Sequence, residues 1–306
     1  MGVTTVPGEN LTRIEAESRR ATVDSHSYEI SLDLTRGAEV FGSRTVVRFA
    51  AVPGASTFID LIAREVHEIT LNGKRVDVAA FADSRIQLDG LEAHNELIVD
   101  ADAMYTNTGE GLHRFVDPVD GEVYLYSQFE VPDSRRVFAV FEQPDLKATF
   151  AFTVTAPAEW KVVSNSPTPE PKRHGDGSAT WIFAPTPRIS SYITAIVAGP
   201  YEEVRSELTS SSGKVIPLGV FARKSLWAHL DADYIFDITR RGFAYFEEKF
   251  GHPYPFEKYD QLFVPEFNAG AMENAGAVTF TETYVFRGKV TDAVKERRVV
   301  TILHEL

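Results

Sequence analysis

A regular alternation of apolar and polar residues dominates the first two thirds of this chain. Residues 28–34 and 45–49 carry an apolar or β-branched side chain at every second position, the period of a strand with one buried face. Asn72-Gly73 is a strong signal for a two-residue hairpin turn. Further strands are predicted for residues 96–99, 150–154, 160–163, 181–183 and 192–197. Many short strands separated by proline and glycine clusters, with a short helix over 13–20 before them, predict a sandwich or saddle of antiparallel sheets.

The pattern changes after Gly199-Pro200. Strand-like residues 204–222 precede a long predicted helix over 225–250, which Gly251 is placed to end. The apolar stripe expected to face the core comprises Ile235, Ile238, Gly242, Tyr245 and Phe246. This change from a period of two to a helical period indicates a second structural unit.

The end of the chain continues this mixed pattern. Residues 261–264 and 278–281 are predicted strands, and a final helix is expected to begin near Asp292, which could cap it. Arg297-Arg298 favours a solvated face on that helix. We therefore expect a mostly β N-terminal domain over residues 1–202 and a mixed α and β domain over residues 203–306.

Composition narrows the possible partners and metal ligands. The net charge of -13 argues against nucleic acid or an anionic membrane as a partner. With no cysteine, the chain has no disulfides, and any metal must be held by histidine and carboxylates. No apolar run reaches the length of a membrane span, and residues 1–17 lack the apolar core of a secretory signal. We expect a cytoplasmic monomer.

His304-Glu305 lies at the end of the apolar helical run 299–303. This is how the helix-borne zinc motif H-E-x-x-H begins, in which two histidines four apart reach one metal and the glutamate takes a proton from bound water. Taken alone, the pair is typical of ordinary helix-end residues. The position of a second histidine lies after the last residue of this sequence.

A glycine-rich segment upstream changes that interpretation. Gly270-Ala271-Met272-Glu273-Asn274 precedes His304-Glu305 by about thirty residues. The combination resembles the aminopeptidase N family of zinc exopeptidases, in particular its bacterial, actinobacterial members. The resemblance extends through residues 108–115, 126–130 and 144–150.

The resemblance implies a fold and an activity. It implies that the mostly β domain is followed by the first part of a thermolysin-like catalytic domain, cut inside the H-E-x-x-H motif. It implies removal of single N-terminal residues from peptides with a free N-terminus. His304 is then a zinc ligand, and Glu305 is the general base that deprotonates a zinc-bound water.

The resemblance also assigns the substrate-binding residues. The backbone of Gly270 and Ala271, in the segment with Met272 and Asn274, pairs with an extended substrate, where glycine permits close approach. Glu273 binds the substrate α-ammonium, a contact that an internal peptide cannot make. By the same resemblance, Glu130 shares that ammonium and Gln128 lines the pocket for the first side chain.

Three alternatives follow from the same residues. One His provides too few ligands for a catalytic zinc, so we expect the 306-residue chain itself to hold no stable zinc and to hydrolyse little. It could instead be a non-catalytic module that binds peptide N-termini, or only a scaffold. An enzyme acting on an epoxide lipid is a further possibility, against which Glu130 argues, since the lipid-hydrolysing relative carries Gln there.

The apolar side chains of the last helix complete these expectations. Val299, Val300, Ile302 and Leu303 are expected to be exposed, and the second domain to be partly disordered or prone to aggregate.

Overall fold

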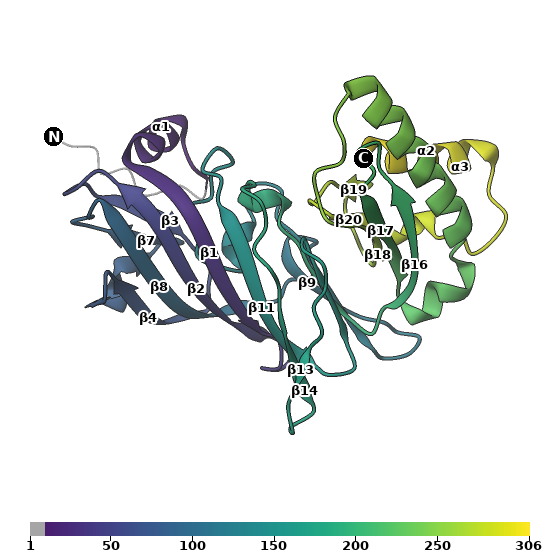
Figure 1. Ribbon diagram of the computed structural model, residues 1–306. Helices are drawn as coiled ribbons and strands as arrows, with labels where there is room; N and C mark the ends of the chain where they lie inside the picture. Colours follow the sequence, from purple (N-terminus) through teal and green to yellow (C-terminus); the bar gives the residue numbers. More distant parts are fainter. Residues whose placement is uncertain (1–9) are drawn as a thin grey trace. The chain divides into compact units, whose positions relative to one another are not determined.

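The computed structural model describes residues 10–306, which form mostly strands with three α-helices. The residues group into two compact units, each assembled from three chain segments (Figure 1). The first unit comprises Met1–Leu112, Gln128–Ala158 and Pro169–Thr194, and the second comprises His113–Ser127, Glu159–Thr168 and Ala195–Leu306. These units are a different division from the predicted domains 1–202 and 203–306, which stay a prediction. Residues 1–9, part of the stretch 1–17 considered for a secretory signal, lie outside the described residues.

The first unit contains an eight-stranded sheet, in the order β13-β14-β11-β1-β2-β8-β4-β5, and a three-stranded sheet, β3-β7-β6. The strands of the large sheet are β1 (Val23–Asp33), β2 (Val40–Ala51), β4 (Glu65–Leu71), β5 (Lys74–Val76), β8 (His94–Met104), β11 (Thr149–Pro157), β13 (Lys172–Arg173) and β14 (Ser178–Ile182). Those of the small sheet are β3 (Thr57–Asp60), β6 (Phe81–Ala82) and β7 (Arg85–Leu88). The predicted alternation is confirmed in β1, where Tyr28, Ile30 and Leu32 are buried and the residues between them are exposed.

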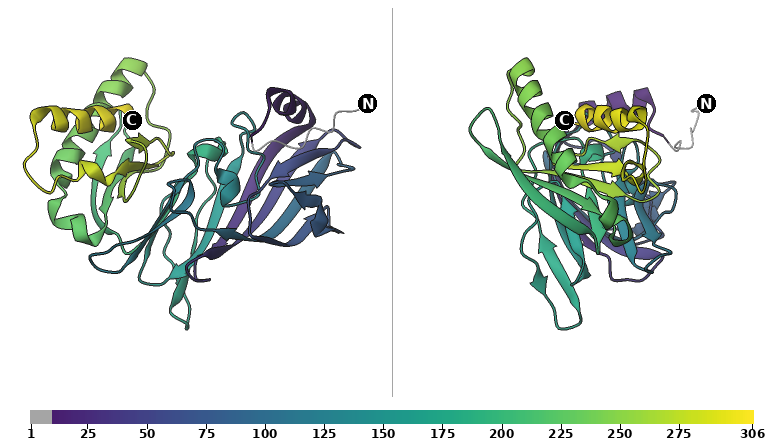
Figure 2. Two further views of the ribbon diagram at one scale, coloured as in Figure 1. Left: turned by 180° about the vertical axis from the view of Figure 1, so that it is seen from behind. Right: turned by 90° about the vertical axis from the view of Figure 1, so that its right-hand side faces the viewer.

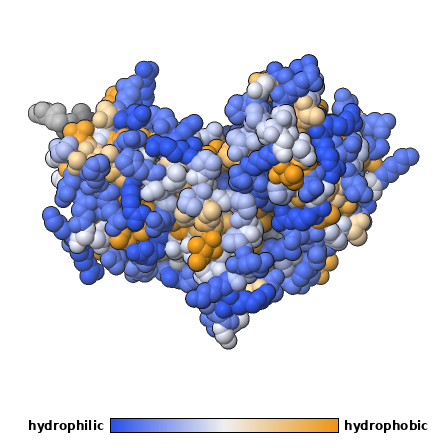
Figure 3. All heavy atoms as spheres, viewed as in Figure 1, coloured by the Kyte–Doolittle hydropathy of each residue, from blue (hydrophilic) through white to orange (hydrophobic). Residues whose placement is uncertain are grey.

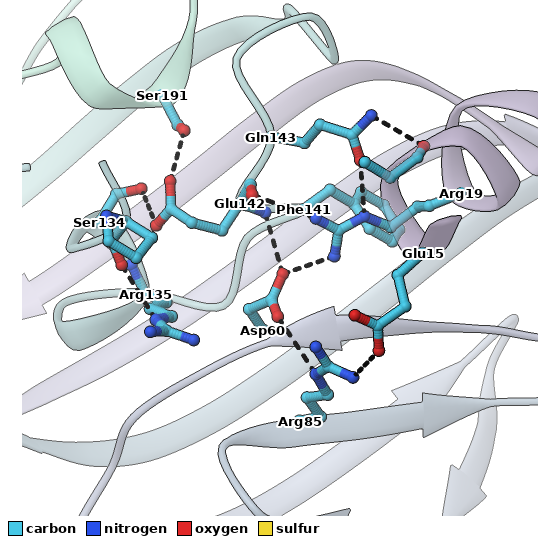
Figure 4. Close-up of polar contacts among 12 residues, drawn as sticks. Glu15, Arg19, Asp60, Arg85, Ser134, Arg135, Phe141, Glu142, Gln143 and Ser191 are labelled. Atoms are coloured by element: carbon cyan, nitrogen blue, oxygen red, sulfur yellow. Dashed lines mark hydrogen bonds and ion pairs between the residues drawn. The ribbon is translucent and has the colours of Figure 1, made fainter. Parts of the chain in front are cut away.

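Helix α1 (Arg13–Thr22) lies beside β1 and β3 in the first unit (Figure 1). It begins with a capping box between Thr12 and Glu15, which satisfies two backbone N–H groups at the helix start. Arg19 projects from it into the core and pairs with Asp60 at 2.5 Å (Figure 4). A second buried cation, Arg85, pairs with Glu15 at 2.6 Å and so ties the helix to β7.

The second unit is built on a five-stranded sheet in the order β16-β17-β18-β20-β19. The strands are β16 (Glu202–Thr209), β17 (Val215–Ala222), β18 (Tyr259–Val264), β19 (Ala271–Met272) and β20 (Ala277–Thr281). The three central strands run parallel, and the two outer strands are antiparallel to their neighbours. A four-stranded sheet, β12-β15-β10-β9, completes the strands: β9 (Gly111–Val116), β10 (Val123–Gln128), β12 (Lys161–Ser164) and β15 (Ile196–Gly199).

Helices α2 (Ala232–Phe250) and α3 (Asp292–His304) pack on the five-stranded sheet through one apolar core (Figure 2). They approach closely at Gly242, where a Cβ would overlap Leu306 and lie 2.6 Å from Leu303. Gly251 ends α2 in the left-handed conformation at φ 62°, as predicted.

Several sequence predictions about these helices are wrong. The helix expected from residue 225 begins at Ala232, because Lys224–His229 forms a 3-10 helix and Leu230 is extended. Thr291 rather than Asp292 occupies the cap of α3, without a side-chain hydrogen bond. Tyr245 is exposed, because α2 turns only Ile235, Ile238, Gly242 and their neighbours toward the sheet.

Two residues of α3 also differ from expectation. Ile302 is buried in the core that α2 and the sheet share, whereas Val300 is exposed as predicted. Arg298 is buried rather than solvated, because it forms a bidentate ion pair with Asp231, at 2.7 and 2.8 Å. Its guanidinium also lies 4.5 Å from the ring centroid of Phe286.

The strand predicted over residues 192–197 is partly wrong. Ser191–Ile193 forms a 3-10 helix, and the strand expected over 192–197 is the shorter β15. Hydrophilic residues predominate on the face seen in Figure 3, where hydrophobic ones form small scattered groups. Among residues 10–306, no helix combines the length and the apolar character that crossing a bilayer requires.

Candidate active site

The predicted substrate-binding segment forms the outer edge of the five-stranded sheet. Ala271 and Met272 make up β19, which pairs antiparallel with β20, Ala271 opposite Phe280 and Met272 opposite Thr279. The carbonyl of Gly270 accepts a hydrogen bond from the Thr281 N–H at 3.0 Å. The other side of β19 carries no paired strand among the described residues, so β19 is an edge strand of this sheet.

Glu273 and Asn274 follow β19, which ends at Met272. Met272 and Asn274 are buried, and Glu273 between them is exposed. Asn274 donates from Nδ2 to Thr279 Oγ1 at 3.3 Å and from its backbone N–H to Met272 O at 2.9 Å. Met272 and Asn274 therefore anchor the segment and leave the Glu273 carboxylate accessible.

Contacts within the described chain do not restrict position 270 to glycine. A Cβ at this position would make only ordinary contacts, 3.6 Å from Tyr284 Oη and 3.9 Å from Thr301 Cγ2. Packing within the described residues therefore does not require glycine here. The predicted close approach of a substrate backbone remains a prediction.

Glu305 follows the last residue of α3 and is buried. Its Oε2 has no hydrogen-bond partner within residues 10–306. Burial, and secondarily the charge of Glu273, raise the pKa of the Glu305 carboxyl to about 7. A buried polar atom without a partner is costly, and perturbed carboxyl groups of this kind are concentrated at functional sites.

His304, the last residue of α3, is exposed and lines a hollow of about 460 Å³ between α2 and the chain end. Four aromatic residues of α2 and the following loop line part of this hollow: Phe243, Phe246, Phe250 and Tyr254. His304 is one potential zinc ligand, whereas a catalytic zinc normally takes three from the protein.

The described residues do not complete a zinc site at His304. Within residues 10–306 the one group of three metal-ligating side chains is Glu65, His67 and Asp102, in the first unit. Asp102 there also pairs with Arg36 at 2.6 Å, and that guanidinium opposes binding of a cation. The residues present therefore do not fit a closed zinc centre.

Gln128 and Glu130 belong to the first unit, whereas Glu273, His304 and Glu305 belong to the second. Gln128 ends β10, and its Oε1 is buried without a hydrogen-bond partner in the described part of the chain. Glu130 is exposed. The sharing of one ammonium by Glu130 and Glu273 remains a prediction.

Sequence reasoning missed the residues that hold the start of the binding segment. Glu266 precedes the segment in a left-handed conformation, φ 53°, which is uncommon for a residue with a side chain. His113 Nε2 lies 3.1 Å from Glu266 Oε2, and Tyr126 Oη donates to the Glu266 carbonyl at 3.2 Å. The His113 and Tyr126 rings stack with centroids 4.8 Å apart. Both residues lie in the segments 108–115 and 126–130 that carried the resemblance, which was the available signal.

The residues that hold the end of the segment were also missed. Asn165 donates from Nδ2 to Ala275 O at 2.9 Å, and Lys258 donates from Nζ to Gly276 O at 2.7 Å. Nothing in the local sequence around 165 or 258 indicates these contacts, because their partners lie far along the chain. The binding segment is therefore fixed at both ends by side chains from other elements.

Comparison with known proteins shows the family to which the chain belongs. Residues 24–193 match the Peptidase M1 N-terminal domain, and residues 234–306 match the Peptidase family M1 domain. The chain is 62% identical to aminopeptidase N of Streptomyces lividans over 98% of its own length and 35% of that protein. It is 34% identical to aminopeptidase M1-A of Oryza sativa subsp. japonica over 64% of the chain and 22% of that protein. Aminopeptidase N of Oryctolagus cuniculus is 25% identical over 98% of the chain and 30% of its own length.

The chain thus spans about a third or less of the length of these relatives. The first match includes Gln128 and Glu130, and the second includes residues 270–274 and His304-Glu305. The chain belongs to peptidase family M1.

Proposed function

We propose that the whole protein containing this chain is a zinc-dependent aminopeptidase that removes single N-terminal residues from peptides. The observation that carries the proposal is the pair Glu305 and Glu273. One is a buried carboxyl with an oxygen that has no partner within residues 10–306, and the other is an exposed carboxylate directly after the edge strand β19, close enough to raise the pKa of the first. Membership of peptidase family M1 supports the peptide bond as the target.

Glu305 is suited to move a proton near neutral pH. A general base works best when its pKa is close to the working pH, and burial brings the Glu305 pKa to about 7. In the proposed step, the carboxylate takes a proton from water as the water oxygen bonds to the scissile carbonyl carbon. The same proton passes to the leaving nitrogen as the carbon–nitrogen bond breaks.

Glu273 is suited to select a chain terminus. Its carboxylate stands beside the open edge of β19, where a substrate backbone could add as a further strand. An α-ammonium forms a charge-assisted hydrogen bond with a carboxylate, whereas an internal peptide has no such group. We propose that Glu130 assists at this ammonium and that Gln128 contacts the first side chain.

Zinc, when bound, would polarise the scissile carbonyl, with His304 as one of its ligands. The other ligands must come from residues that the described chain does not bring to His304. For a polypeptide of these 306 residues alone, we propose binding of peptide N-termini without hydrolysis. Its cytoplasmic location and monomeric state remain predictions from the sequence.

Two measurements test the proposal together. Zinc content and hydrolysis of an alanyl anilide are measured for the 306-residue chain and for the whole protein after dialysis against metal-free buffer. We expect a zinc-to-protein ratio near zero and no turnover for the chain, and a ratio near one with turnover for the whole protein. Turnover of N-acetylated substrate at the same rate as the free amine would contradict an exopeptidase.

A further inference from the structure

The end of the binding segment is held by an ammonium group that is almost completely removed from water. Lys258 is 3% exposed, and its Nζ donates to the Gly276 carbonyl at 2.7 Å. The Asp260 N–H reaches the same carbonyl at 3.1 Å. Burial lowers the pKa of Lys258, while the charge of Asp260 acts in the opposite sense. Burying an ammonium group costs free energy unless it has a charged partner, so the partner of Lys258 belongs to the same arrangement.

That partner is Asp260, which is fully buried and lies 2.8 Å from Lys258 Nζ through Oδ2. Its other oxygen pairs with Arg205 Nη1, also at 2.8 Å. Arg205 in turn pairs with Glu203 at 2.7 Å, and Glu203 with Lys161 at 2.7 Å. Charges of alternating sign therefore run from the partly exposed Lys161 to the buried carbonyl of Gly276.

Arg205 and Asp260 can pair across the five-stranded sheet because a glycine lies between them. Arg205 on β16, Gly219 on β17 and Asp260 on β18 stand side by side in register. A Cβ at Gly219 would overlap Asp260 Oδ1 and lie 2.7 Å from Arg205 Nη1. The missing side chain at the centre of a buried strand thus leaves the space in which the Arg205–Asp260 pair forms.

The backbone of Ala275 and Gly276, whose carbonyls accept these hydrogen bonds, has little freedom to move. Gly276 has φ 70°, the left-handed conformation that favours glycine. A Cβ there would lie 2.7 Å from the Asn165 carbonyl and 3.3 Å from that of Lys258. Asn165 also accepts the Ala195 N–H at 3.0 Å while it donates to Ala275, so it is fixed from both sides. Two buried side chains therefore hold consecutive carbonyls, beginning two residues after Glu273.

We propose that Lys258, paired with Asp260 and Arg205 across Gly219, is a positioning group that fixes the Glu273 carboxylate for the substrate α-ammonium. This inference rests on the proposed role of Glu273. Lys258 touches no substrate and acts only through the backbone of Ala275 and Gly276. A binding carboxylate must be held within about 0.5 Å of its productive place, and such positions depend on supporting contacts.

The effect of these charges on substrate binding can be measured separately from their effect on stability. A buried ion pair can often be replaced by apolar residues of similar size without loss of stability. The double variant Lys258→Met/Asp260→Leu is therefore expected to fold while it loses the Lys258 donor to Gly276. Gly219→Ala disturbs the same pair from the other side of the sheet without changing any charged residue.

Two control variants match these changes. Lys161→Met removes the charge at the partly exposed end of the row and leaves the buried pair intact. Gly288→Ala adds a methyl group to a glycine of the same unit, at a place where no atom of residues 10–306 lies within 4 Å of the new Cβ. Both controls are expected to behave as the parent protein.

The kinetic test uses the whole protein and an alanyl anilide, with zinc content and thermal midpoint measured for every variant. We expect Glu273→Gln, the double variant and Gly219→Ala each to raise KM by at least about tenfold, the effect of losing about 1.4 kcal/mol of binding. The zinc content and thermal midpoint of the double variant should stay those of the parent. A purely structural role would lower the thermal midpoint and leave the KM of the folded protein unchanged.

The outcomes separate the two proposals. If Glu273→Gln raises KM and the folded double variant does not, the positioning role is overturned and the proposed function stands. If Glu273→Gln leaves KM unchanged, the role of Glu273 is wrong and the positioning proposal falls with it. Hydrogen exchange of residues 270–277 in the whole protein adds a readout without activity. Faster exchange in the double variant and not in Lys161→Met supports the proposal, and unchanged exchange overturns it.

Discussion

Glu142 and Glu305 are buried carboxyl groups in different units of the molecule, and burial raises the pKa of each to about 7. Their surroundings differ in one respect. Glu142 accepts hydrogen bonds from Ser134 Oγ at 2.5 Å, from the Arg135 N–H at 2.8 Å and from Ser191 Oγ at 3.0 Å (Figure 4). Oε2 of Glu305 has no partner in the described part of the chain.

This contrast shows that a raised pKa does not by itself identify a functional group. Glu142 is satisfied by three donors, and its own backbone N–H donates to Asp60, so its place is structural. Oε2 of Glu305 is buried without such a donor in the described part of the chain. An unpaired buried oxygen is expected where a substrate or a metal-bound water supplies the missing contact. Accounting for each hydrogen-bonding atom distinguishes the two groups.

The largest difference is expected in catalysis. In the whole protein, Glu305→Gln should lower kcat by about 10²–10⁴-fold, because an amide cannot accept the proton from the attacking water. Glu142→Gln should leave kcat unchanged. Turnover of an alanyl anilide at equal zinc content measures both, and equal losses in the two variants would remove the distinction.

The second difference is expected in the free energy of unfolding, which substitution by leucine should lower at Glu142 and raise at Glu305. In the 306-residue chain at pH 8, Glu142→Leu should cost about 3–5 kcal/mol, because three buried donors lose their acceptor. Glu305→Leu should instead stabilise by about 1 kcal/mol, because it removes a buried oxygen that has no partner among the described residues. Hydrogen exchange read separately in β11 and β18 assigns each change to its unit. A destabilised β18 in Glu305→Leu would show that Glu305 has a structural partner.

The pH dependence of stability sharpens the comparison for Glu142. Its folded pKa, about 7, lies above the ordinary 4.5, so the folded state keeps a proton that the unfolded state releases between these values. Stability is therefore fully present below pH 4.5 and is lost as the pH rises through 7. One pKa unit corresponds to about 1.4 kcal/mol, so the expected loss is on the order of 3 kcal/mol.

Glu142→Gln should remove this dependence, since the amide does not titrate. Hydrogen exchange of the β11 amides reports this pH dependence of stability for the first unit. It is measured between pH 5 and pH 8 and corrected for the intrinsic exchange rate. Glu159→Gln, an exposed position in the other unit, is the control. An unchanged slope in Glu142→Gln would assign the pH dependence to another group.

The smallest effect is expected from a single donor. Ser191→Ala removes one of three hydrogen bonds to Glu142 and should cost about 1 kcal/mol. The cost should be greater at pH 8 than at pH 5, because this hydrogen bond favours the ionised carboxylate. Ser18→Ala, on the exposed side of α1, serves as the control. The same cost at both pH values would mean that Glu142 does not change its ionisation in this range.

Much of the fold and part of the site could be predicted from local sequence. The alternation in residues 28–34 predicted β1, and Gly251 predicted the end of α2, because both signals depend on neighbouring residues. The resemblance carried by residues 270–274 and 304–305 predicted the family.

Tertiary structure alone decided which charged residues are buried. Arg298 lies in a sequence typical of a solvated helix face, yet its partner Asp231 is 67 residues away. Arg205 and Asp260 are separated by 55 positions and meet only because Gly219 stands between them in the sheet. A period of two or 3.6 reports which face of an element is apolar, because it depends on neighbours in the chain. The partner that makes a buried charge tolerable is fixed by the packing of distant elements, and no local pattern contains it.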